Sequence, residues 1–104
     1  MKQQMSTPFK PAEVFPPGEF LREELEARQW TQKQFARILG RPLQMVNEIL
    51  RGRKRITEET AKEIGLALGT GPELWINLET YYRLHTAPDP DPAIARRAAA
   101  ATAA

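Results

Sequence analysis

The sequence predicts an all-α protein with five short helices packed around one core. Apolar residues recur three and four positions apart, which is the spacing of a helix face, and the chain shows neither a strand pattern nor an internal repeat. Proline, threonine and glycine stand where helices are expected to start and stop. With 104 residues, 41% of them hydrophobic, the chain can supply one small core and two tails.

The first helix is expected over about residues 16–29, where the sequence reads PPGEFLREELEARQ. Its two prolines preset the backbone of the first turn, and Glu19 places a negative charge near the positive end of the helix. One face collects the apolar side chains of Phe20, Leu21 and Leu25.

The second helix has the clearest start signal in the chain. Thr31 and Gln34 form a capping box, in which each side chain bonds the backbone N–H of the other residue. Trp30 and Phe35 flank this cap and can form a hydrophobic staple. Gly40 is placed to end the helix after barely two turns. The inward residues are Phe35, Ala36 and Leu39.

The third helix is expected over about residues 42–51, with Pro42 in its first turn and Gly52 as its stop. The inward stripe consists of Val46, Ile49 and Leu50. The outward side carries Leu43, Gln44, Asn47, Glu48 and Arg51. A helix of about ten residues is marginal alone, so packing must hold it in place.

Two further helices complete the predicted domain. The fourth opens at Thr57 and stops at Gly69. Its core-facing residues are Ala61, Ile64, Ala67 and Leu68. The fifth opens at Pro72 and carries an apolar stripe of Leu74, Trp75, Leu78, Tyr81 and Tyr82. Such a stripe could line a ligand pocket but is more often core, so we expect it to serve the core and a dimer contact.

The helical domain is expected over residues 16–85, between two tails. Residues 1–15 are polar, contain two prolines and show no sustained period, so a flexible arm is expected. Residues 86–104 form a Pro/Ala-rich tail, in which TAPDPDP cannot be helical through its prolines. The final AIARRAAAATAA has high helix propensity but too little apolar bulk to make a core.

Composition excludes several classes of protein. Without cysteine, the chain can form neither a disulfide framework nor a thiolate zinc site. His85 has no second imidazole to complete a metal site, and no nucleophile–base pair or glycine-rich phosphate loop is visible. We therefore expect no cofactor and no enzymatic activity. No apolar run could span a bilayer or act as a secretory signal, so a cytoplasmic, nucleoid-associated protein is expected.

Positive charge is concentrated in one part of the chain. Residues 37–55 contain six basic residues and one acid, whereas residues 19–28 and 56–79 carry net charges of −2 and −4. A basic run is most often a solvated loop, so it needs a structural reason to be a binding surface.

That reason lies in residues 28–55, RQWTQKQFARILGRPLQMVNEILRGRKR. A two-turn helix, a tight turn containing Gly40 and a second short helix with a polar outward face are typical of a helix-turn-helix. Ala36 is small enough to let the helices cross closely, while Val46 and Ile49 pin the second helix from beneath. The first helix can then lie across a phosphate backbone while the second enters a major groove.

This span resembles the helix-turn-helix of the phage repressor (Cro/C1, or XRE) superfamily, which implies a repressor-like fold. Over residues 16–85 the chain resembles HigA-type (VapI-like) antitoxins, through the segments PGEFLREEL, NEILRGRKRIT, ETA and LALGTGPELWINL. The resemblance implies the antitoxin of a type II toxin–antitoxin module. Such a protein is a homodimer that represses transcription at a palindromic operator and neutralises a cognate toxin, typically a RelE-like mRNA-cleaving enzyme. The alternative is a stand-alone XRE-family repressor.

The resemblance also assigns roles to residues. Gln32 matches the phosphate-contacting glutamine of the family. Base-reading positions are occupied by Leu43, Gln44, Met45 and Asn47. Basic residues expected at the DNA are Arg41, Arg51, Arg53, Lys54 and Arg55. Pro42 departs from the family, because many repressors have Ser or Thr there, so the family's base preference cannot be transferred.

Plainer interpretations stay open for several residues. Gln44 and Asn47 can pair with adenine or can simply face solvent. Met45 can touch a thymine methyl group or can pack under the turn. The first helix carries the carboxylates of Glu19, Glu23, Glu24 and Glu26. They form either a solvated face or an acidic face that could meet a basic toxin.

Overall fold

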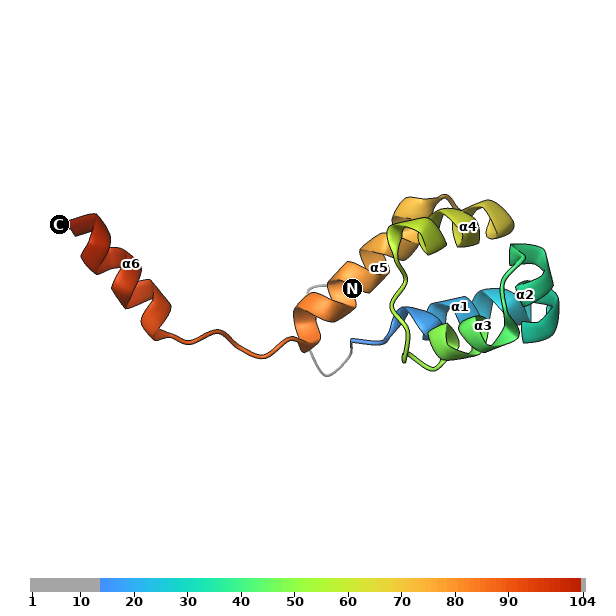
Figure 1. The fold of residues 1–104 in the computed structure, drawn as a ribbon, viewed down its shortest axis with the longest axis horizontal. Coiled ribbons are helices and arrows are strands. Elements are labelled where there is room, and N and C mark those ends of the chain that lie inside the picture. The colour runs from blue at the N-terminus through green and yellow to red at the C-terminus, as the bar shows by residue number, and fades with distance from the viewer. Residues whose placement is uncertain (1–13, 104) are drawn as a thin grey trace, which may run out of the picture.

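The computed structural model describes residues 14–103, which form six α-helices and no strand (Figure 1). The helices are α1 (Pro17–Ala27), α2 (Gln32–Leu39), α3 (Leu43–Leu50), α4 (Glu58–Leu68), α5 (Pro72–Thr86) and α6 (Ala93–Ala103). The all-α prediction is confirmed, and the predicted count of five is wrong by one helix. Residues 1–13, nearly all of the predicted N-terminal arm, lie outside the described residues.

The additional helix, α6, lies in the segment predicted as a Pro/Ala-rich tail. Its alanine-rich sequence has high intrinsic helix propensity, and Asp91 Oδ1 accepts a hydrogen bond from the backbone N–H of Ala93 at 2.9 Å. Arg97 also pairs with Asp91 at 3.4 Å. No residue of α6 is buried, and the helix stands away from the other five (Figure 1). Local propensity rather than packing therefore accounts for α6.

The boundaries of α2 follow the predicted start and stop residues. The backbone N–H of Gln34 donates to Thr31 Oγ1 at 3.0 Å, and that of Thr31 donates to Gln34 Oε1 at 2.8 Å. This is the predicted capping box. The rings of Trp30 and Phe35 stack with their centroids 6.3 Å apart, as the predicted staple requires. Gly40 ends the helix with a φ of 69°.

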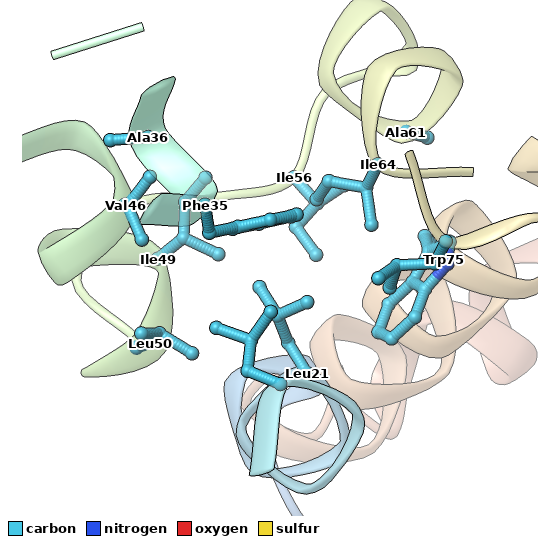
Figure 2. Close-up of a cluster of buried hydrophobic side chains, with 12 residues drawn as sticks. Leu21, Phe35, Ala36, Val46, Ile49, Leu50, Ile56, Ala61, Ile64 and Trp75 are labelled. Carbon is cyan, nitrogen blue, oxygen red and sulfur yellow. The ribbon is translucent and has the colours of Figure 1, made fainter. Parts of the chain in front are cut away.

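The core lies where α1 to α5 meet, and each of these helices contributes one of the five largest fully buried side chains (Figure 2). These side chains are Leu21, Phe35, Val46, Ile64 and Trp75. Burying an apolar side chain of this size contributes about 1.5–3 kcal/mol, which is how helices that are marginal alone are held together. The indole N–H of Trp75 donates to Thr70 Oγ1 at 2.8 Å, so the one polar group of this buried ring has a hydrogen-bond partner.

Three residues predicted on inward faces lie at the rim of the core instead. Phe20, Leu74 and Tyr81 are 39%, 43% and 37% exposed. Successive helical residues point about 100° apart, and on α1 it is Leu21, 1% exposed, that points into the core. On α5, Trp75 is buried and its neighbour Leu74 lies outside. Tyr81 belongs to the C-terminal half of α5. Figure 1 shows that α5 continues beyond α4.

The first turn of α1 lies against the last turn of α3. A Cβ added to Gly18 would lie 2.6 Å from the backbone oxygens of Ile49 and Leu50, closer than Cβ atoms approach other heavy atoms in proteins. One turn later, Arg22 Nη2 donates to Leu50 O at 3.4 Å. The absence of a side chain at Gly18 therefore allows α1 to fix the end of α3.

Candidate nucleic-acid interface

A three-residue turn joins α2 to α3 and sets how the two helices cross. Gly40 adopts the left-handed conformation, and the backbone N–H of Arg41 donates back to Ala36 O at 3.0 Å. Pro42 follows as the residue that caps α3, one position before its predicted place inside the helix. Ala36 and Val46 are buried, as the helix-turn-helix prediction requires.

The outward side of α3 begins with two accessible side chains. Leu43 is 46% exposed. Gln44 is also exposed, with its Nε2 donating to Glu48 Oε2 at 3.4 Å. Met45 is partly buried and packs against the core, which favours the packing alternative over contact with a thymine methyl group, and DNA contact by Met45 stays a prediction. Leu43 and Gln44 therefore have the access that contact with base edges requires.

A hydrogen bond between amide side chains links the start of α2 to the middle of α3. Asn47 Nδ2 donates to Gln32 Oε1 at 3.0 Å, and both residues are partly buried. The bond uses the carbonyl oxygen of Gln32, so its amide nitrogen is the group that Gln32 can offer to a phosphate. The predicted phosphate-contacting residue and a predicted base-reading residue are thus held together as one unit.

The residues between α3 and α4 carry a cluster of exposed cations, which we call the basic segment: Arg51, Arg53, Lys54 and Arg55. After the α3 C-terminus the chain turns at Gly52, which has a φ of 77°. The backbone N–H groups of Arg53 and Lys54 then donate to Glu48 O at 2.8 and 3.2 Å. The structure therefore places these cations directly after the predicted recognition helix, as the sequence predicts.

Arg41 occupies a different environment from the other predicted DNA-contacting residues. Its guanidinium pairs with Glu63, and with Glu59 at 3.1 Å, both on α4. The hydrogen bond from Arg41 lowers the pKa of Glu63, and that same pairing raises the pKa of Arg41. Arg41 therefore fastens the turn to α4. Contact with DNA by Arg41 stays a prediction and would have to compete with two carboxylates.

Residues 21–75 match the sequence family described as Helix-turn-helix, a span that runs from α1 into α5. The chain belongs to the helix-turn-helix family. The sequence of this helix-turn-helix protein is also similar to that of the uncharacterized HTH-type transcriptional regulator YddM of Escherichia coli (strain K12). The two are 27% identical over 68 residues, 65% of this chain and 72% of YddM.

Solved structures similar to this helix-turn-helix protein fall into two kinds. An addiction module antidote protein of a HigA family from Coxiella burnetii is 37% identical, with a TM-score of 0.66 over 69% of this chain and 79% of that one. A protein described as an antidote of a plasmid maintenance system, from Nostoc punctiforme, is also 37% identical, with a TM-score of 0.65 over 67% and 77%. PA4674 of Pseudomonas aeruginosa, solved with its 18-base-pair operator DNA, is 32% identical, with a TM-score of 0.68 over 71% and 81%.

The protein is thus a helix-turn-helix DNA-binding regulator, whereas its HigA-type subfamily stays a prediction. No helix within residues 14–103 is long and apolar enough to cross a membrane. In that same range no group of His, Asp and Glu side chains could hold a metal ion. His85 Nδ1 lies 2.9 Å from Tyr81 O.

Sequence reasoning missed one buried carboxylate in this helix-turn-helix protein. Glu79 on α5 is 3% exposed, and its Oε1 accepts a hydrogen bond from the backbone N–H of Ile56 at 3.0 Å. Its Oε2 pairs with Arg83 and lies 3.9 Å from Arg55 Nε. One feature could have indicated this burial: Glu79 follows Trp75 by four residues and so shares its inward face.

Proposed function

We propose that this protein is the antitoxin of a type II toxin–antitoxin module. In this role it binds a palindromic operator as a homodimer, represses its own transcription, and binds and neutralises a RelE-like mRNA-cleaving toxin. The main support is the exposed outward side of α3 with the basic segment immediately after it. The likeness to antidote proteins at 37% identity adds the toxin-binding half of the proposal.

In the proposed complex with DNA, α3 enters the major groove and α2 crosses the phosphate backbone. Leu43, Gln44 and Asn47 face base edges, and an amide that pairs with adenine in two places discriminates by about 1–3 kcal/mol. Gln32 and the basic segment contact phosphates, which adds affinity without sequence preference. PA4674, solved with its operator DNA, supports the operator-binding part of the proposal.

The proposed homodimer follows from the small size of a single reading helix. α3 has only eight residues, so one copy makes few base contacts, whereas a dimer reads two half-sites about one helical turn apart. Exposed apolar side chains on α5, including Leu84 at 69% and Leu74 at 43%, offer surface for such a contact.

A stand-alone repressor without a toxin is the second candidate, favoured by the likeness to YddM, a transcriptional regulator by name. The two candidates share the DNA-binding half and differ only in the partner protein. A neighbouring reading frame for a small basic toxin would favour the antitoxin.

Co-expression distinguishes the two. The neighbouring reading frame expressed alone should arrest growth, and co-expression with this protein should restore growth and yield a complex that co-purifies. The Gln44→Ala, Asn47→Ala double variant should still rescue growth, because toxin binding is proposed to use a surface other than α3. Growth arrest that this protein cannot relieve would contradict the antitoxin proposal and leave the repressor.

A further inference from the structure

Glu79 is the one charged residue that is buried within residues 14–103. A buried carboxylate is costly unless its oxygens are paired, so its partners show what holds it there. One oxygen accepts the backbone N–H of Ile56, and the other faces Arg83 and Arg55. Two of these three partners, Ile56 and Arg55, lie at the end of the basic segment rather than on α5.

The basic segment is fixed at both ends. At its start, the N–H groups of Arg53 and Lys54 donate to Glu48 O on α3. At its end, the side chain of Ile56 is 2% exposed and its N–H donates to Glu79. The four cations of the segment are exposed, so the backbone bonds of Arg53, Lys54 and Ile56 set where these cations lie relative to α3.

Glu79 contacts the end of the basic segment through Ile56 and Arg55, and the hydrogen bond to Ile56 is the stronger of these two contacts. The Arg55 side chain is 68% exposed and its Nε is 3.9 Å away, so solvent screens that pair. The bond to Ile56 is buried at 3.0 Å, and a buried N–H that loses its acceptor is costly. The reach of the carboxylate, more than its charge, therefore holds the end of the segment.

We propose that Glu79 is a positioning residue for DNA binding: from α5, it holds the basic segment in the place where its cations meet the phosphates. This inference rests on the proposed DNA-binding role of that segment. In this inference α5 contributes to DNA binding indirectly, by holding the basic segment in place.

Two mild substitutions separate reach from charge. Glu79→Asp keeps the charge but withdraws the acceptor by one methylene, whereas Glu79→Gln keeps an oxygen at the same reach and removes the charge. Ile64→Val is the matched control, because it loosens the same core at a fully buried α4 position. Thermal unfolding followed by circular dichroism identifies a temperature at which all three variants are folded, and binding is measured at that temperature.

The readout is the slope of log K against log salt, measured by fluorescence anisotropy on two labelled duplexes of about 30 base pairs, enough for two half-sites. One has an arbitrary sequence, and the other comes from the DNA upstream of the protein's own reading frame. Glu79→Asp should weaken binding to both equally and lower the slope by about 0.9 for each phosphate that the protein no longer neutralises. Glu79→Gln and Ile64→Val should keep the wild-type slope.

An unchanged slope in folded Glu79→Asp would overturn the inference and leave the proposed function standing. An equal fall in Glu79→Gln would also overturn it, because the charge would then be the property that matters. If the unaltered protein showed no preference for the upstream duplex, the proposed operator function would fail instead. A lack of binding to either duplex would overturn both.

Discussion

The amide side chains of Gln32 and Asn47 meet at 3.0 Å and are expected to act as one unit in DNA binding. Gln32→Ala and Asn47→Ala should each weaken operator binding, and the double variant should lose less than the sum of the two. Residues that share a hydrogen bond show coupling energies of about 0.5–3 kcal/mol. Anisotropy titrations of the four proteins measure this coupling energy. Gln32→Ala combined with Gln44→Ala is the control and should be additive.

Gln44 and Arg53 should separate base reading from phosphate contact. Gln44→Ala removes a neutral amide, so operator affinity should fall by about 1–3 kcal/mol while binding to random DNA and the salt slope stay unchanged. Arg53→Ala removes a charge, so both DNAs should bind more weakly and the slope should fall by about 0.9. Salt titrations on both duplexes test this. The reverse pattern would mean that α3 is not docked in the groove as proposed.

The ion pair between Arg41 and Glu63 should make stability depend on pH at the acidic end. Because the folded-state pKa of Glu63 is lowered, its contribution is complete above the ordinary glutamate pKa of about 4.3. That contribution is lost as the pH falls through the lowered value. The urea midpoint of Glu63→Gln should lie below that of the wild type at pH 7, and the gap should close below about pH 4. In an Arg41→Gln background the Glu63→Gln gap should be small at every pH.

Gly40, in the turn between α2 and α3, and Gly18, on α1, are required for different reasons, and alanine should distinguish them. At Gly40 an added Cβ meets nothing within 4 Å, so Gly40→Ala should cost only the backbone strain of a positive φ, about 1–2 kcal/mol. At Gly18 the Cβ would meet backbone oxygens of α3, so Gly18→Ala must shift α1 or α3 and should cost more. Urea unfolding gives both costs. Gly18→Ala should also weaken operator binding in protein that is still folded, because the end of α3 moves.

Local signals predicted the elements well, because a helix end depends on few neighbouring residues. The capping box at Thr31 and the left-handed stop at Gly40 lie where the sequence placed them. The hydrogen-bond partners of Arg41 and Glu79 could not be predicted in this way. Their partners lie 22 and 23 residues away in sequence, so the pairing exists only once α4 and α5 have packed. Helix α6 was missed because the prediction required apolar bulk, whereas alanine propensity and Asp91 suffice for a helix.

At the scale of the whole molecule, the proposed operator binding depends on the oligomeric state, because two half-sites are read by two copies of α3. Light scattering should report a dimer at micromolar concentration. Leu84→Glu, which puts a charge on the exposed apolar side of α5, should shift the mass to that of a monomer and weaken operator binding. Ile94→Glu is the matched control, because Ile94 is similarly exposed at 52% but lies on the separate α6. A wild-type monomer with full operator affinity would contradict the homodimer.

The two sides of α3 divide their tasks, and this division bears on how such a regulator can diverge. Val46, Ile49 and Leu50 hold the helix in the core, while Leu43 and Gln44 contribute little to that packing. Exchanging the exposed pair should therefore change the preferred operator at little cost to folding. After gene duplication, the two copies could come to bind different DNA sequences through a few substitutions, and every intermediate would still fold. A library randomised only at these two positions offers a direct route to regulators that bind different DNA sequences.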